Sequence, residues 1–312
     1  MQDTFKKRVL FVGMPDMALV CLTKLYNAGV NIVGVVPPEK TNGTYGFFIQ
    51  FAQSMGLKVI DYENSLKDKL FLSKIKALEA DIAVVCSYNK LFPKEFLSMT
   101  KDGFVNVHPS LLPEYRGGNP YSHVIINKEA ETGITLHFMD ESFDTGDIIS
   151  QYKIPLDKAE TMGTLFNKLN FLASDVLLHA LKFYESNSTL PRVKQPEGEY
   201  KRAYSLDVNL GNTLIDWNKS ADEIERFIRA LNPFITAGTR FRKTYTKINT
   251  AVAKDKKHKF QPGEICYVKD SVGVACGEGI LVLKTLQVGS YINGDCSDFI
   301  RVFKPQVGEV FE

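Results

Sequence analysis

The sequence predicts an α/β protein: a doubly wound parallel sheet followed by a smaller, β-rich C-terminal domain. Short apolar runs alternate with segments of helical periodicity over the first 200 residues. Such runs are typical of parallel strands that helices cover on both faces. From residue 239 onward, short β-rich runs separated by turns replace this alternation, which favours a small barrel. We therefore expect two domains, at residues 1–200 and 205–312.

The first domain opens with a buried apolar strand that ends in a glycine turn. Pro15 and Asp16 suit the first turn of the helix that follows. The expected strands are 8–13, 31–36, 58–60, 81–86, 105–108, 133–138 and 148–154, and the expected helices are 14–27, 46–55, 66–78 and 161–184. In open α/β sheets ligands bind at the carboxyl ends of the strands, which is where residues 106–108 fall.

A linker at 195–199, marked by its proline and glycine, leads to the second domain. A helix at 220–231 follows, with Ser220 and Glu223 at the spacing of a capping box and Asn232-Pro233 at its end. The expected strands of this domain are 247–252, 263–268, 273–276 and 279–286.

Charge and composition exclude several classes of protein. Lys and Arg number 38 against 36 Asp and Glu, which argues against a general polyanion-binding surface. The chain has no apolar run long enough for a membrane span, and a basic start leads straight into a strand, which argues against a secretory signal. The five cysteines are scattered, which favours buried free thiols in a reducing cytoplasm over a zinc site or disulfides. We expect a cytoplasmic protein with no membrane partner, and the oligomeric state is not predicted.

The expected strand at 105–108 carries an amide and an imidazole two positions apart, at Asn106 and His108. Residues i and i+2 of a strand share a face, so the two side chains stand together. Alone, such a pair is better interpreted as two satisfied polar residues. However, Asp144 follows the next apolar run on a turn, from which its carboxylate could reach the imidazole. An amide donor beside a titratable ring at a rigid strand end is suited to acyl transfer.

Two motifs resemble the signature of the folate-dependent formyltransferase family: N-V-H-P-S-L-L-P-E-Y-R-G at 106–117 and F-D-T-G-D-I at 143–148. I-D-W at 215–217 and R-A-L-N-P at 229–233 look like the junction to the OB-like C-terminal domain of its methionyl-tRNA and aminoarabinose members. The resemblance implies a Rossmann-like sheet with an OB-like β-barrel. It also implies an enzyme that transfers a formyl group from 10-formyltetrahydrofolate, its co-substrate, to a primary amine without a metal. The family's catalytic Asn, His and Asp match Asn106, His108 and Asp144.

Each of these three side chains has an expected role in formyl transfer. Asn106 can donate its amide hydrogens to the developing oxyanion. His108 can take a proton from the attacking amine or, when charged, donate to the oxyanion, and the sequence does not separate these roles. We expect Asp144 to fix the orientation of the ring and to favour its protonated form.

The same resemblance places the pterin between the loop after the strand at 81–86 and the loop at 140–144. It implies folate contacts, mostly through the backbone, at Tyr88, Asn89, Leu91, Asp140, Glu141, Phe143 and Asp144. Tyr88 and Phe143 are equally consistent with packing. On the acceptor side we expect Arg116, Gly117 and Gly118 in a flexible basic rim, where Arg116 either meets a phosphate or carboxylate or is a solvated arginine.

The loop after the second strand bears on which amine is formylated. Methionyl-tRNA formyltransferases carry a long basic insertion there, whereas the corresponding loop of this chain, residues 36–46, is short and nearly neutral. From Ser205 onward 15 Lys and Arg stand against 13 Asp and Glu, which offers no clear set of phosphate contacts. The sequence therefore favours a nucleotide-linked amino sugar or another small amine. Initiator methionyl-tRNA is the alternative acceptor, and hydrolysis of 10-formyltetrahydrofolate is a second alternative.

Other classes fit the sequence less well. Asp144-Thr-Gly also matches an aspartic-protease signature, but no second such triplet supplies the paired carboxylate. NAD binding would require a G-x-G-x-x-G motif, which the chain lacks. A catalytically silent folate-binding module would not need all three reactive residues intact. The basic run at 254–259 is interpreted as a solvated turn. The remaining histidines lack metal-ligand spacing and are interpreted as structural: His123, His137, His179 and His258.

Overall fold

The computed structural model describes residues 5–63, 65–88 and 90–312. The chain forms two compact units. The sheet unit consists of the described residues of Met1–Pro120 together with Glu131–Pro155 and Asn167–Ala203, and the barrel unit consists of Tyr121–Ala130, Leu156–Phe166 and Tyr204–Glu312. Two short segments from within the first 200 residues therefore belong to the barrel unit, so the chain passes between the units more than once.

The sheet unit is built on six strands in the order β2-β1-β3-β4-β6-β7. They are β1 (Val9–Gly13), β2 (Ile32–Val36), β3 (Ile82–Cys86), β4 (Phe104–His108), β6 (Glu131–Phe138) and β7 (Ile148–Pro155). The first four strands pair in parallel, which confirms the predicted α/β class and parallel core. In contrast to the parallel prediction, β6 runs antiparallel to β4, and β7 runs antiparallel to β6. Residues 139–147, which join β6 to β7, are too few for the crossover that parallel neighbours need.

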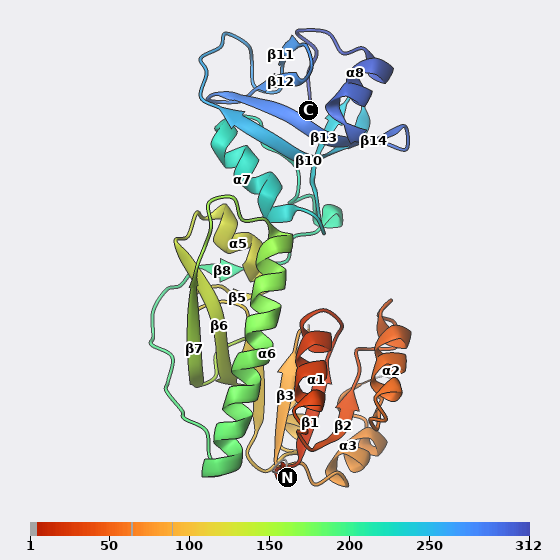
Figure 1. Cartoon of the computed structure of the whole chain (residues 1–312), viewed down its shortest axis with the longest axis vertical. Helices are drawn as coiled ribbons and strands as arrows, with labels where there is room; N and C mark the ends of the chain where they lie inside the picture. Colours follow the sequence, from red (N-terminus) through yellow and green to blue (C-terminus); the bar gives the residue numbers. More distant parts are fainter. Residues whose placement is uncertain (1–4, 64, 89) are drawn as a thin grey trace. The chain divides into compact units, whose positions relative to one another are not determined.

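Helices cover both faces of this sheet. They include α1 (Met17–Asn27), α2 (Tyr45–Ser54), α3 (Lys69–Lys76), α4 (Lys94–Leu97) and α6 (Met162–Asn187). Side chains of α3 and α4 pack on one face with Leu10 and Val12. Val9 and Phe11 point to the other face and are also fully buried, so that face is covered too. An ion pair joins α1 and α6, which lie side by side (Figure 1). The strand expected at 58–60 is reduced to a single bridge with β2.

The barrel unit contains an antiparallel sheet of six strands. In the order β11-β12-β13-β10-β9, with β14 beside β13, these are β9 (Ala237–Phe241), β10 (Thr244–Lys254), β11 (Ile265–Val268), β12 (Val272–Ala275), β13 (Ile280–Val288) and β14 (Ile292–Asp295). The residues that follow α8 (Cys296–Phe303) join the two edges of this sheet, because Phe311 bridges to Phe241 and Val310 bridges to Glu264. The separate C-terminal β domain that the sequence predicts is thus confirmed.

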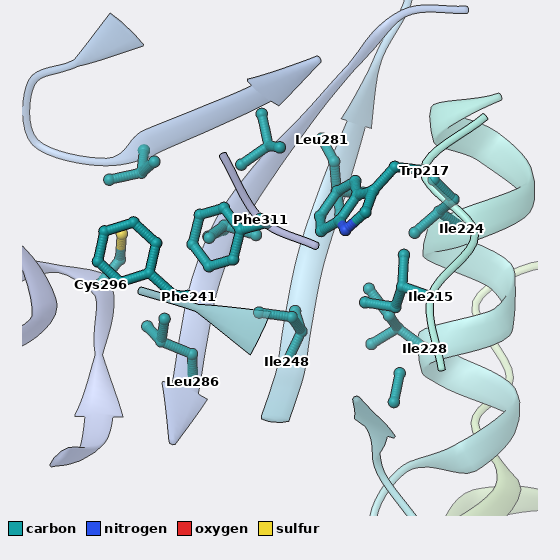
Figure 2. Close-up of a cluster of buried hydrophobic side chains, with 14 of the residues drawn as sticks. Ile215, Trp217, Ile224, Ile228, Phe241, Ile248, Leu281, Leu286, Cys296 and Phe311 are labelled. Atoms are coloured by element: carbon teal, nitrogen blue, oxygen red, sulfur yellow. The ribbon is translucent and has the colours of Figure 1, made fainter. Parts of the chain in front are cut away.

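An apolar core fills the barrel unit (Figure 2). The ring of Phe241 lies 4.9 Å from that of Phe311 and 5.1 Å from that of Phe299. Helix α7 (Ala221–Leu231) buries one side against this core and begins at the predicted capping box of Ser220 and Glu223. Burial of this kind contributes about 25 cal/mol for each Å² of apolar surface removed from water.

The five cysteines are free thiols, four of them buried and Cys266 partly buried, as their scattered spacing predicts. Among the described residues, no helix combines the length and the apolar character that crossing a bilayer requires.

Candidate active site

Three polar side chains converge at the fourth strand of the sheet unit. Asn106 and His108 lie on β4, and Asp144 lies on the loop between β6 and β7. The Asn106 Nδ2 atom is 3.4 Å from Asp144 Oδ1, and His108 Nδ1 is 3.6 Å from Asp144 Oδ2. The amide, imidazole and carboxylate that the sequence singles out are therefore neighbours in space.

The His108 ring is held by a backbone carbonyl. Its Nε2–H donates to the carbonyl oxygen of Tyr115 at 2.9 Å, because a carbonyl can only accept. The carboxylate of Asp144 is too far from Nδ1 for a good hydrogen bond, so the Tyr115 carbonyl orients the ring here, and the fixing of the ring by Asp144 stays a prediction. Burial lowers the pKa of His108 and outweighs the opposing effect of Asp144. Asp144 favours the protonated form of the ring, as expected, but burial outweighs it, so the ring is neutral near pH 7 and Nδ1 can accept a proton.

Asp144 is held as a carboxylate. Burial acts to raise its pKa, but His108, His137 and the Gly117 N–H outweigh burial, so the pKa lies well below its usual range. The backbone N–H of Gly117 donates to Oδ2 at 2.9 Å. This bond stabilises the ionised form even while His108 is neutral, since a backbone N–H can only donate.

His137, whose spacing predicts only a structural role, lies in contact with Asn106 and Asp144. It stands opposite Asn106 in the register between β6 and β4. Its Nδ1–H donates to the Phe138 carbonyl at 2.7 Å, which leaves Nε2 to accept from Asn106 Nδ2 at 3.0 Å. This contact decides which end of the Asn106 amide faces the ring. The second N–H of Asn106 makes only the long contact with Asp144 and can be offered to a ligand.

A network of neutral side chains fixes the loop between His108 and Tyr115. The Thr135 hydroxyl donates to the Ser110 carbonyl at 2.6 Å and accepts from the Leu112 N–H at 3.1 Å. Gln151 donates to the Leu112 carbonyl at 2.6 Å. The carbonyl that orients His108 therefore comes from a loop with defined hydrogen bonds, in line with a preorganised site.

Two of the predicted acceptor residues, Arg116 and Gly117, form a short strand. β5 (Arg116–Gly117) pairs in parallel with β8 (Arg202–Ala203). Gly117 has a φ of 106°, and a Cβ at this position would lie 2.2 Å from the Ala203 carbonyl oxygen, so only glycine fits. The Arg116 guanidinium donates to the side chain of Gln195, and Gly118 is exposed.

Some of the predicted folate residues line a cavity and others support its loops. Leu91 and Glu141 line a pocket of about 350 Å³ with Tyr62 and Phe92. Asp140 accepts from the Thr145 hydroxyl and the Ser142 N–H and so shapes its own loop. The Tyr88 hydroxyl contacts that of Tyr62 at 2.6 Å, and burial raises its pKa, so it stays protonated. Phe143 is half exposed, and Asn89 lies outside the described residues.

Comparisons with known proteins agree over nearly the whole chain. The family described as formyl transferase matches residues 7–181, and the formyl transferase C-terminal domain matches residues 209–304. The methionyl-tRNA formyltransferase of Clostridioides difficile is 35% identical over 309 residues, which cover 92% of this chain and 97% of the relative. That of Acetivibrio thermocellus is also 35% identical, with coverage of 97% and 99%.

Solved structures of low sequence identity share the fold. The N-formyltransferase of Helicobacter canadensis, solved with folinic acid and dTDP-3-aminofucose, has a TM-score of 0.65 at 19% identity and covers 89% of this chain and 98% of its own. HypX of Aquifex aeolicus, solved with tetrahydrofolic acid, has a TM-score of 0.63 at 16% identity over 97% of this chain. This chain spans 48% of HypX. At these identities the likeness shows the fold alone.

Proposed function

Because the chain belongs to the formyl transferase family, we propose that it moves a formyl group from 10-formyltetrahydrofolate to a primary amine at Asn106, His108 and Asp144. It is a formyl-transferring enzyme. The observation that carries the assignment of the site is the convergence of an amide and a neutral imidazole on one carboxylate, which lies 3.4 Å from the amide and 3.6 Å from the imidazole. This is the set of groups that acyl transfer between nitrogens requires.

In this proposal the amine nitrogen attacks the formyl carbon, and His108 takes the proton that the amine loses. The lowered pKa of His108 supports the role of a base, because the ring is already neutral at pH 7. The anionic Asp144 stabilises the imidazolium that forms, and the second N–H of Asn106 stabilises the oxyanion. The bond from the formyl carbon to the folate nitrogen then breaks, and that nitrogen receives the proton.

The pocket that Leu91 and Glu141 line supports a site for the pterin. It lies on the loop after β3 and the loop that carries Asp144, and its walls include the rings of Tyr62 and Phe92. A flat heterocycle with polar edges suits a pocket with aromatic walls and carboxylates at its rim.

Initiator methionyl-tRNA is the acceptor that the comparisons favour. The two relatives described above match 92% and 97% of this chain and are methionyl-tRNA formyltransferases. The amino sugar that the sequence favours has weaker support, because the sugar N-formyltransferases are related to this chain through the fold alone.

A nucleotide-linked amino sugar stays as the second candidate because of the loop after β2. The two charged residues of this loop are engaged by neighbours in the sheet unit: Glu39 contacts Lys90, and Lys40 lies 3.3 Å from Glu63. A loop that grips nucleic acid needs basic side chains free to meet phosphates. This loop offers none beyond Lys40.

One experiment separates the candidates. The protein is incubated with 10-formyltetrahydrofolate and, in separate reactions, with initiator methionyl-tRNA, a panel of nucleotide-linked amino sugars, or no amine. We expect formyl-methionyl-tRNA as the preferred product, absent with the Asp144→Asn variant. A kcat/KM higher for an amino sugar than for the tRNA would establish the second candidate. Formate release that no amine accelerates would indicate a hydrolase and contradict the proposal.

A further inference from the structure

Gln195 lies in a segment that composition marks as a linker, yet it behaves differently from its neighbours. Residues 191–194 and 196–199 are exposed, whereas Gln195 is partly buried. The segment is anchored on both sides. Val193 exchanges two backbone hydrogen bonds with Ile148, and β8 pairs with β5. These anchors hold Gln195 in register with the loop that carries Asp144.

The amide of Gln195 uses its full hydrogen-bonding capacity. Its Nε2 atom donates to the carbonyl oxygens of Asp144 and Gly146, both at 2.8 Å. Its Oε1 atom accepts from Arg116 Nε at 3.1 Å and from Arg116 Nη2 at 2.5 Å. A glutamine amide has two donor hydrogens and two acceptor lone pairs, and all four are occupied here.

Both the backbone and the side chain of Asp144 are held by hydrogen bonds from neighbouring segments. Gln195 holds the backbone of Asp144, while the Gly117 N–H, one residue after Arg116, holds its side chain. Gly146 is packed so closely that a Cβ there would lie 2.0 Å from the Phe138 carbonyl oxygen. The carbonyl of Gly146 therefore has a fixed direction, and Gln195 is the partner that it meets.

We propose that Gln195 is a positioning residue of the transfer site, which holds the backbone of Asp144 and Gly146 and orients the Arg116 guanidinium as a binding group for a phosphate of the acceptor. The proposal rests on the formyl transfer argued above. Gln195 is uncharged, so it orients Arg116 without cancelling its positive charge. Guanidinium groups bind phosphates through paired N–H donors. Both candidate acceptors, a tRNA and a nucleotide-linked sugar, carry phosphates.

Two substitutions separate the two halves of this role. Gln195→Ala removes the support of the Asp144 loop and should lower kcat about tenfold. Gln195→Glu also places a carboxylate against Arg116, so KM for the acceptor should rise about tenfold and lose its dependence on salt. Arg116→Gln should raise KM in the same way with a smaller change in kcat, which keeps the test valid should a Gln195 variant fold poorly.

Lys194→Gln is the matched control, because this exposed neighbour changes the net charge by the same amount as Gln195→Glu. We expect its kcat and KM to stay within twofold of the parent. Parent-like kcat and KM in both Gln195 variants, or a KM change in Lys194→Gln equal to that in Gln195→Glu, would overturn the proposal.

A binding measurement keeps this proposal distinct from the proposed function. Inorganic pyrophosphate is titrated into the parent, Gln195→Glu and Lys194→Gln by calorimetry. We expect binding by the parent and the lysine variant and its loss in Gln195→Glu, whether or not formyl transfer is detected. Equal binding by all three proteins would refute the role of Arg116 as an anion group oriented by Gln195.

Discussion

Two regions of the protein, one in each unit, bury different kinds of side chain. In the sheet unit, β4 and β6 bring polar groups into the interior: Asn106, His108, Thr135 and His137. In the barrel unit, the cluster in Figure 2 consists of aliphatic and aromatic side chains with two cysteine thiols. An unpaired buried polar group costs about 1–3 kcal/mol, so each of these four groups needs the partner that it has. The difference indicates where the fold serves chemistry and where it serves stability.

Of the substitutions considered, His108→Ala should have the largest effect on catalysis. Removal of the base should lower kcat about 10³-fold, equivalent to about 4 kcal/mol. The free energy of unfolding should fall by about 1–3 kcal/mol, because the Tyr115 carbonyl loses the hydrogen bond from the ring, which is far less than the effect on kcat. Turnover is measured by formyl-product formation, with His179→Ala on the exposed side of α6 as the control. More than a tenth of the parent activity in His108→Ala would contradict its role as base.

Phe311→Ala tests whether the apolar cluster of the barrel unit contributes to stability and not to catalysis. The substitution leaves a cavity among Phe241, Phe299 and Trp217, whose rings lie 4.9 to 6.1 Å from that of Phe311. We expect the free energy of unfolding to fall by about 3 kcal/mol, from denaturant titration, while kcat of the folded protein stays within about threefold. Val310→Ala, whose side chain is partly exposed, is the control and should cost less than about 0.5 kcal/mol. A loss of turnover without a loss of stability would contradict the assignment of Phe311 to a purely structural core.

His137→Leu tests whether a buried polar side chain of the sheet unit orients the Asn106 amide. The leucine leaves the Asn106 N–H and the Phe138 carbonyl without their partner. We expect kcat to fall about tenfold, close to 1.4 kcal/mol, because the orientation of the amide that faces the oxyanion is lost. His137→Gln offers another acceptor and should recover part of the rate. Identical rates for the two variants would show that His137 is there only to fill space.

The smallest expected effect is a shift in a titration. Burial places the pKa of His108 below its usual 6.5, and Asp144 opposes that shift. An NMR titration of the ring should therefore give a midpoint below 6.5, and Asp144→Asn should lower it further. Since the neutral ring is the base, kcat/KM should be constant near pH 7 and fall as the pH drops through this midpoint. A midpoint above 6.5 would mean that attraction to Asp144 outweighs burial.

Local patterns were sufficient to predict much of the fold and to single out three residues of the candidate site. The parallel strands could be predicted because each is a continuous apolar run, and Asn106 and His108 because two positions on one strand share a face. His137 was missed because its role depends on the register of β6 against β4, which is set by tertiary pairing. The alternation of Thr135 and His137 with apolar neighbours on β6 was the available signal.

Long-range contacts explain the rest of what the sequence did not reveal. Gln195 reaches Asp144 across 51 residues of chain, and its surroundings of Pro, Gly and Glu are those of a linker. The reversal of β6 was missed for a similar reason, since strand direction follows from how the intervening segment packs. Loop composition favoured an amino sugar as acceptor, whereas the relatives that are similar over nearly the whole chain are methionyl-tRNA formyltransferases.

The interleaving of the two units has a consequence for anyone who dissects this enzyme by truncation. A fragment that stops at Ala203 retains 121–130 and 156–166 but loses the side chains on which they rest, such as Phe234 against Phe166 and Arg229 against the Glu160 carbonyl. Such a fragment would expose apolar surface that residues after Ala203 normally cover. It should therefore aggregate, even though Asn106, His108 and Asp144 are all present. An autonomous catalytic core would need those two segments redesigned, and a single cut at the linker would not release one.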